Sequence, residues 1–170
     1  MDVLVVRHGI ALDKDEANER GVPDAERPLT KDGRRRMKRV ARGLVLSVPN
    51  LAAIFSSPWR RAAETAALLQ ARFKGLEKVE SEALLPGAEP EALAQCLVEY
   101  LAGRPAAAAV AVVGHEPHLS EWVSWCLTEH RHPMIELRKG GACLLRFADT
   151  PGPGLGKLLW LMTPAVLRQL

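Results

Sequence analysis

The sequence is poor in cysteine and has no pair of cysteines at metal-binding spacing. Its three cysteines are widely separated, at Cys96, Cys126 and Cys143. An odd number without a C-x-x-C pair argues against a disulfide framework and against a zinc knuckle. We therefore expect a protein of the reducing cytoplasm.

Long apolar runs are also lacking. No run approaches the roughly 20 residues that a membrane-spanning helix needs. The first residues, MDVLVVRHG, have neither the basic start nor the small-residue cleavage site of a signal peptide. The net charge is only +3 over 170 residues, and no aromatic residues are interleaved with the basic ones. We expect a soluble protein that binds neither a membrane nor a nucleic acid.

Several common catalytic motifs are missing. The sequence contains no G-x-x-x-x-G-K-[ST] phosphate loop and no G-x-S-x-G elbow, which argues against P-loop nucleotide hydrolysis and serine hydrolase chemistry. HEPH, at 115–118, differs from the zinc motif H-E-x-x-H because its histidines are three apart with Pro117 between them. HRH, at 130–132, has no accompanying carboxylate or cysteine pattern. We expect no metal site and no cofactor.

Short apolar runs alternate with segments of helical periodicity along the chain. We predict strands at 2–6, 52–57 and 107–114, and a closing hairpin of strands at 141–148 and 156–163. We predict helices that begin after the cap Thr30, at Ser57 and Pro58, at Pro90 and at His118, the third of them ending at Gly103. This order predicts an α/β fold, a three-layer α/β/α sandwich with a mainly parallel mixed sheet. The length suggests one domain over residues 1–170.

Polar residues of an unusual kind follow three of the predicted strands. Arg7 and His8 follow the first, the segment 56–61 with Arg60 and Arg61 follows the second, and His115 follows the third. Ligands of parallel sheets bind beyond the carboxyl ends of the strands. Guanidinium groups and a helix N-terminus are suited to a phosphoryl group. Either His8 or His115 could then attack phosphorus as a neutral imidazole.

Five segments in this order resemble the histidine phosphatase superfamily, which is phosphoglycerate mutase-like, and within it the small SixA-type phosphohistidine phosphatases. They are VVRHGIA, ERPLTKDG, SSPWRRAAETA, LLPGAEP and VVGHEPHLS. The resemblance covers nearly the whole chain. It implies one histidine phosphatase domain. In this superfamily, specificity for small molecules tends to come from insertions that cover the pocket. A chain of this length has little room for such insertions, so we expect no large cap over the pocket.

The resemblance also implies roles for single residues. His8 would be the nucleophile that becomes phosphorylated, Arg7 and Arg61 would bind the phosphate, and His115 would complete the phosphate-binding pocket. Arg60 is rejected, because one helical step turns a side chain by about 100° and the two neighbours cannot face the same group. Larger family members carry a carboxylic acid that protonates the leaving oxygen. The candidates here are in no clear motif, and the acid is left open among Glu80, Glu82 and Glu89.

The resemblance and the missing acid favour phosphohistidine on a partner protein as the substrate. Imidazole is a much less basic leaving group than an alkoxide and depends less on a proton donor. Six basic residues avoid the apolar stripe of the helix after Thr30: Arg34, Arg35, Arg36, Lys38, Arg39 and Arg42. They form either a solvated face or a docking surface for an acidic histidine-phosphorylated carrier protein. Two alternatives are the same chemistry on a small phosphate ester or anhydride, and a binding module without turnover. The oligomeric state is left open.

Overall fold

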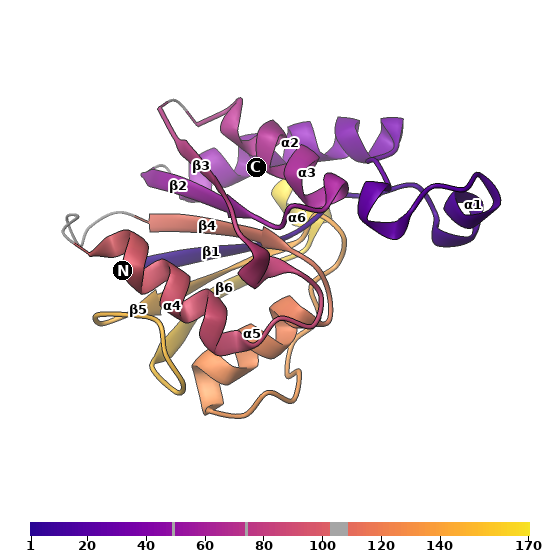
Figure 1. Cartoon of the computed structure of the whole chain (residues 1–170). Coiled ribbons are helices and arrows are strands. Elements are labelled where there is room, and N and C mark those ends of the chain that lie inside the picture. The colour runs from indigo at the N-terminus through magenta and orange to yellow at the C-terminus, as the bar shows by residue number, and fades with distance from the viewer. Residues whose placement is uncertain (49, 74, 103–108) are drawn as a thin grey trace.

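A single six-stranded sheet forms the centre of the protein. The computed structural model describes residues 1–48, 50–73, 75–102 and 109–170 (Figure 1). The strand order is β3-β2-β4-β1-β5-β6. The strands are β1 (Asp2–Arg7), β2 (Leu51–Ser56), β3 (Glu77–Glu80), β4 (Ala109–Gly114), β5 (Ala142–Phe147) and β6 (Gly156–Met162). The pairs β1–β4, β2–β4 and β2–β3 are parallel, whereas β1–β5 and β5–β6 are antiparallel. The sheet is therefore mixed, and the predicted hairpin forms its antiparallel side.

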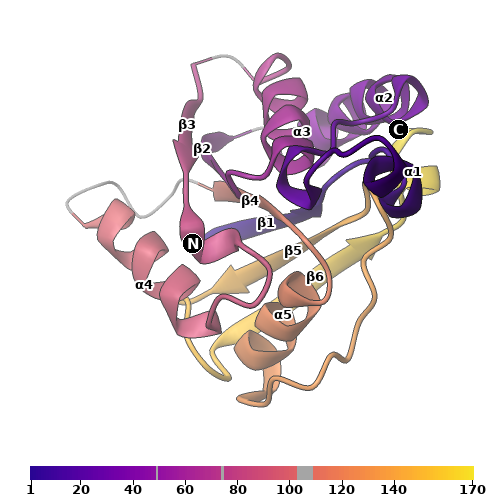
Figure 2. The same ribbon diagram turned by 45° about the vertical axis from the view of Figure 1, so that its right-hand side comes forward.

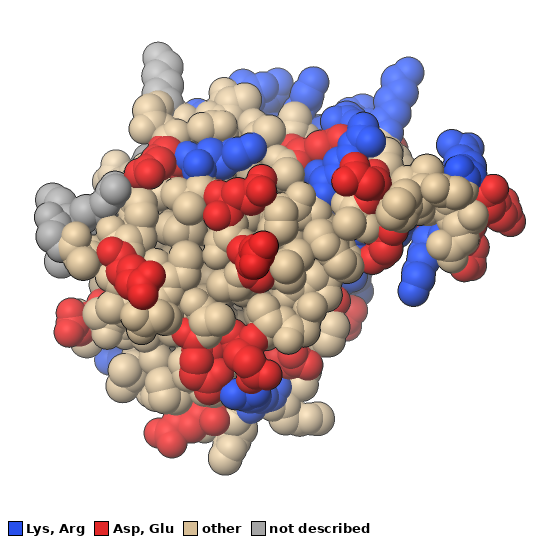
Figure 3. Space-filling view, viewed as in Figure 1, with Lys and Arg blue, Asp and Glu red and all other residues tan. Residues whose placement is uncertain are grey.

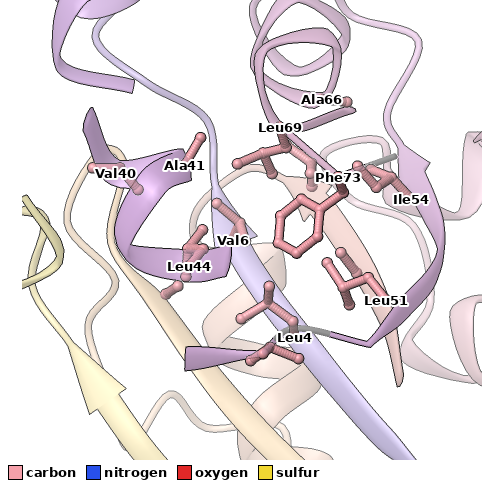
Figure 4. Close-up of a cluster of buried hydrophobic side chains, with 14 of the residues drawn as sticks. Leu4, Val6, Val40, Ala41, Leu44, Leu51, Ile54, Ala66, Leu69 and Phe73 are labelled. Atoms are coloured by element: carbon pink, nitrogen blue, oxygen red, sulfur yellow. The ribbon is translucent and has the colours of Figure 1, made fainter. Parts of the chain in front are cut away.

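One face of the sheet is covered by α2 (Lys31–Ser47), α3 (Arg60–Gln70) and the short α6 (Pro164–Leu167). Because alternate residues of a strand point to opposite faces, Leu4 and Val6 of β1 belong to this side. They pack with Leu44 of α2 and Leu69 of α3 in a cluster that is almost inaccessible to solvent (Figure 4). Burial of each such side chain contributes about 1.5–3 kcal/mol.

The other face is covered by α4 (Pro90–Leu101) and α5 (His118–Thr128), which lie below the sheet in Figure 2. Val3 and Val5, the intervening residues of β1, join Leu97 of α4 and Trp122 of α5 in the second cluster. The predicted α/β/α layers are thus confirmed. None of the helices in the described ranges is both long enough and apolar enough to cross a membrane.

Of the four predicted helix starts, those after Thr30, at Pro90 and at His118 are confirmed and one is wrong. The Thr30 hydroxyl accepts from the Gly33 N–H over 2.9 Å and caps α2, and Pro90 is the first residue of α4. Helix α3 begins at Arg60 with Trp59 as its cap, not at Ser57 and Pro58. The Ser57 hydroxyl accepts from the Trp59 N–H and also bonds to a histidine ring of β4's loop, so residues 57–59 form a turn before the helix. Gly103, the predicted end of α4, lies outside the described residues.

The connection from β1 to α2 extends beyond the carboxyl end of the sheet. It contains α1 (Lys14–Glu19) and a short 3₁₀ turn (Asp24–Glu26), at the right of Figure 1. A second 3₁₀ turn (Glu82–Leu84) follows β3. The start of α2 lies close against this connection, because a Cβ on Gly33 would be 2.0 Å from the Ile10 carbonyl oxygen. The sequence periodicity predicted neither α1 nor the polar edge strand β3.

Candidate active site

The carboxyl ends of β1, β2 and β4 meet at a cavity of about 360 Å³. Four of the residues that line it are Arg7, His8, Arg61 and His115. They come from three segments far apart in the sequence, and parallel pairing brings those segments to one edge of the sheet. All four predicted site residues therefore lie together.

His8 presents an unprotonated ring nitrogen toward Arg61. Its Nδ1 lies 2.7 Å from the carbonyl oxygen of Gly9. Since a carbonyl can only accept, Nδ1 carries the proton and Nε2 does not. Arg61 is consistent with this tautomer, because its Nε donates to His8 Nε2 over 3.3 Å. The ring is 6% exposed, and its unprotonated nitrogen is the one that can attack an electrophile.

The surroundings of His8 keep the imidazole neutral. Burial lowers the pKa of His8 to about 3, and the positive charges of Arg61, Arg7 and Lys139 act in the same direction. The hydrogen bond to Gly9 opposes this shift without cancelling it. At neutral pH the side chain is an uncharged base surrounded by cations, which suits an attack on an anionic group.

Arg61 is held from several sides. It is 4% exposed, and one terminal nitrogen donates to the backbone oxygen of Asp24 over 2.6 Å. The other lies 3.4 Å from Asp24 Oδ2, and the guanidinium carbon lies 4.6 Å from the centre of the Trp59 ring. Its neighbour Arg60 is exposed and pairs with Glu64 over 3.1 Å. Of the two arginines, Arg61 lines the cavity.

Thr65, one turn along α3, joins the arginine to the loop after β1. Its hydroxyl donates to the Arg61 carbonyl over 2.7 Å and accepts from the Gly9 N–H over 3.1 Å. Gly9 leaves no room for a side chain, because a Cβ there would be 2.5 Å from Met37 Cγ. These contacts fix the residue after His8 against the helix that carries Arg61.

His115 lies beside His8, with ring centroids 5.1 Å apart. Its Nε2 is 2.9 Å from the Ser57 hydroxyl, and its Nδ1 is buried without a partner in the described part of the chain. Burial lowers the pKa of His115 to about 2, and the positive charge of Arg61 acts in the same direction. Arg7 donates to the Leu137 carbonyl over 2.7 Å, and its buried Nε also has no partner among the described residues. Buried polar atoms of this kind are usually satisfied by a ligand or water.

Other charged residues of the cavity did not emerge from the sequence. They are Asp13, Lys14, Asp24, Arg27, Glu116 and Lys139. Arg27 belongs to ERPLTKDG, but the segment suggested no role for it. Its guanidinium donates to Asp24 Oδ1 and to the Leu12 carbonyl, over 2.6 and 2.7 Å. The clearest missed signal is Glu116, because it directly follows His115 in the turn that already pointed to a site.

The three glutamates considered as acids do not line this cavity. Glu80 and Glu82 are exposed, and Glu89 is exposed and pairs with Arg131. His130 and His132, of the HRH segment, are exposed as well. Within the described ranges, no group of three or more His, Cys, Asp or Glu side chains is placed to hold a metal ion.

Comparison with known proteins identifies the family. Residues 3–85 match the model of the histidine phosphatase superfamily (branch 1), a stretch that contains Arg7, His8 and Arg61. The chain belongs to the histidine phosphatase superfamily. An uncharacterized protein of Picosynechococcus is 32% identical to this chain over 146 residues, which are 86% of this chain and 85% of the relative.

The fold of this chain is similar to that of the protein histidine phosphatase SixA, solved with tungstate. The TM-score is 0.80 at 22% identity, over 98% of this chain and 99% of SixA. It is also similar to a mycobacterial glucosyl-3-phosphoglycerate phosphatase solved with VO3. That TM-score is 0.70 at 16% identity, over 95% and 99% of the two chains. At these identities the likeness shows a shared fold. It confirms the predicted histidine phosphatase fold without a large cap, and the family supports a phosphatase activity.

Proposed function

We propose that this protein hydrolyses phosphohistidine on a partner protein, through a covalent phosphohistidine intermediate on His8. The observation that carries the proposal is the tautomer of His8. Its Nδ1–H is bonded to Gly9, and its Nε2 lone pair lies beside the buried Arg61. A neutral imidazole held in this way is an activated nucleophile that needs no further base.

In the first step, His8 Nε2 forms a bond to phosphorus while the bond from phosphorus to the leaving group breaks. Arg7, Arg61 and His115 bind the phosphoryl oxygens and stabilise the charge of the transition state. In the second step, water attacks phosphorus, the N–P bond breaks, and the electron pair returns to Nε2 as phosphate leaves. The two arginines supply fixed positive charge, so the reaction as proposed requires no metal ion.

Two features support a protein substrate. SixA, whose fold this chain shares, is a protein histidine phosphatase. The outer side of α2 is basic, and Lys and Arg side chains gather along the top of Figure 3, over α2. Arg34 pairs with Glu64, and both Arg35 and Arg36 pair with Asp32. Lys38, Arg39 and Arg42 are exposed and form no ion pair within the described residues, so they could dock an acidic carrier.

A second candidate is the same chemistry on a small phosphate ester. The mycobacterial neighbour is a glucosyl-3-phosphoglycerate phosphatase, so this fold also carries enzymes that act on small molecules. The carboxyl group of Glu116 in the cavity wall favours this candidate, because esters depend on a proton donor more than phosphohistidine does. A binding module without turnover is the remaining alternative.

Phosphate release distinguishes these candidates. We expect faster release from a histidine-phosphorylated carrier protein than from a panel of small phosphate esters and anhydrides, with no effect of chelators. His8→Ala should abolish release, whereas His132→Ala, a change of an exposed histidine, should not. Faster release from one small ester would select the second candidate. Phosphate binding without release from any substrate would select the binding module.

A further inference from the structure

Glu116 lines the cavity, its carboxyl group has no part in the proposed reaction, and its hydrogen bonds are all to neutral groups. It follows His115 at the end of β4 and is partly buried. One oxygen accepts from the Leu137 N–H over 3.2 Å, and the other accepts from the Ser120 hydroxyl of α5. Within the described residues it forms no ion pair.

The other two carboxylates of the cavity have structural tasks. Asp13 caps α1 by accepting from the Asp15 N–H over 2.9 Å, and this bond lowers its pKa. Burial alone would raise the pKa of Asp24, but the charges of Arg61 and Arg27 outweigh it and the pKa falls. Both are therefore ionised at neutral pH. Neither can supply a proton.

The environment of Glu116 shifts the pKa of its carboxyl group in the opposite direction, which is upward. Burial raises its pKa, against the hydrogen bonds from Ser120 and Leu137 and the positive charge of Arg7. The groups that face it are Arg7 of β1, the Cys143 thiol of β5, the Ser120 hydroxyl of α5 and the Leu137 N–H of the segment before β5. Of these, only Arg7 is charged. Carboxyl groups whose environments differ in this way within one site are typical of acid and base roles.

We propose that Glu116 is the proton donor to the leaving group, and that the substrates therefore include phosphate esters of aliphatic alcohols. This inference rests on the proposed attack by His8. As the P–O bond of the ester breaks, the proton of the Glu116 carboxyl group passes to the departing oxygen, which leaves as a neutral alcohol. The Glu116 carboxylate then takes a proton from the water that attacks the phosphorylated His8, and the starting state is restored.

The test compares two esters that differ in leaving group. Glu116→Gln keeps an amide oxygen that can accept from Leu137 but has no proton to donate. Loss of a general acid costs about 10²–10⁴ in rate. We expect a loss of this size in kcat/KM for an alkyl phosphate and a change of only a few-fold for p-nitrophenyl phosphate, whose leaving group needs no proton. Glu136→Gln, an exposed neighbour in the segment before β5, is the matched control and should leave both rates unchanged.

Equal losses with the two esters would contradict the proposal and show instead that Glu116 positions Leu137 and Arg7. No loss with either ester would also contradict it. If the variant folds poorly, the pH dependence of the wild-type protein carries the test. Turnover of the alkyl ester should fall on the alkaline side as Glu116 ionises, whereas p-nitrophenyl phosphate should show no such fall. A parallel fall with both esters would contradict the role.

A separate measurement distinguishes failure of the proposed attack by His8 from failure of the role of Glu116. Phosphorylation of His8 by p-nitrophenyl phosphate should be as fast in Glu116→Gln as in the wild type. A wild-type protein that hydrolyses both esters without a phosphohistidine would overturn the proposed function, whatever the two rates are. A wild-type protein that forms phosphohistidine and shows no leaving-group effect of Glu116→Gln would overturn only the role of Glu116.

Discussion

Arg61 donates from Nε to the unprotonated Nε2 of His8 over 3.3 Å. A buried cation is thus in direct contact with the lone pair of the proposed nucleophile. The contact disfavours protonation of the imidazole. It also places the guanidinium beside the position that the phosphoryl oxygens would occupy during attack. The same arginine therefore adds to the effect of burial in keeping His8 neutral, and in the proposed reaction it binds the phosphoryl group.

Replacing each of the adjacent arginines tests this relationship. Arg61→Ala removes charge-assisted bonds that are strongest in the transition state, and we expect kcat/KM to fall by roughly 10² or more. Arg60 is exposed and its partner is Glu64, so Arg60→Ala is the matched control and should cost far less. The measurement is steady-state turnover of an aryl phosphate. Equal losses would mean that the cavity does not distinguish the two side chains.

Variants of Thr65 test whether its hydroxyl holds the loop that follows His8 against α3. Thr65→Val keeps the shape of the side chain but leaves the buried Gly9 N–H without an acceptor, which costs about 1–3 kcal/mol of unfolding free energy. We expect turnover to fall as well, because the loop after β1 is no longer fixed to α3. Thr65→Ser retains the hydroxyl and should preserve most of the unfolding free energy and most of the turnover. Loss of stability in the serine variant equal to that in the valine variant would show that the hydroxyl is not the support.

The sequence predicted those helices and strands whose apolar residues recur at a regular spacing, and it predicted where the central strands end. Arg7, His8, Arg61 and His115 could be found because parallel strands bring their carboxyl ends to one edge. Asp24, Glu116 and Lys139 lie in connections, where no period relates a residue to its neighbours in space. Ser57 followed by Pro58 is a typical helix start, yet the tertiary bond from Ser57 to His115 delays the helix to Arg60. The hydrogen bonds that decide the His8 tautomer are also tertiary.

The buried histidines predict loss of stability in mild acid. The unfolded chain binds protons at His8 and His115 near pH 6.5, the ordinary value, whereas in the folded chain their pKa values are about 3 and about 2. The unfolded state holds more protons between these limits, so the unfolding free energy decreases as the pH falls from 6.5 toward 3. The slope is about 1.4 kcal/mol per pH unit for each histidine.

Urea unfolding at several pH values measures this slope. In the double variant His8→Gln, His115→Gln, the slope between pH 6 and pH 4 should be smaller than in the wild type, because two of the protons are no longer taken up. An identical slope in the two proteins would contradict the burial of neutral imidazoles at these positions.

The exposed basic residues of α2 test the protein substrate. Arg39→Glu combined with Arg42→Glu should slow the dephosphorylation of an acidic histidine-phosphorylated carrier several-fold and leave hydrolysis of a small aryl phosphate unchanged. Added salt should also slow the wild-type reaction with the carrier, because it screens the attraction. Lys78→Glu combined with Lys157→Glu makes the same change of charge on exposed residues of β3 and β6 and is the control. Equal effects of the two pairs would exclude a specific docking role for α2.

The phosphorylated intermediate is the most direct test of the account. After brief reaction with a labelled substrate, quenching should give a protein adduct that is stable in alkali and lost in acid, as an N–P bond requires. Peptide mapping should place it on His8. It should be absent in His8→Ala and present in His132→Ala. An acid-stable adduct on a serine or an aspartate, or turnover that persists in His8→Ala, would contradict nucleophilic attack by His8.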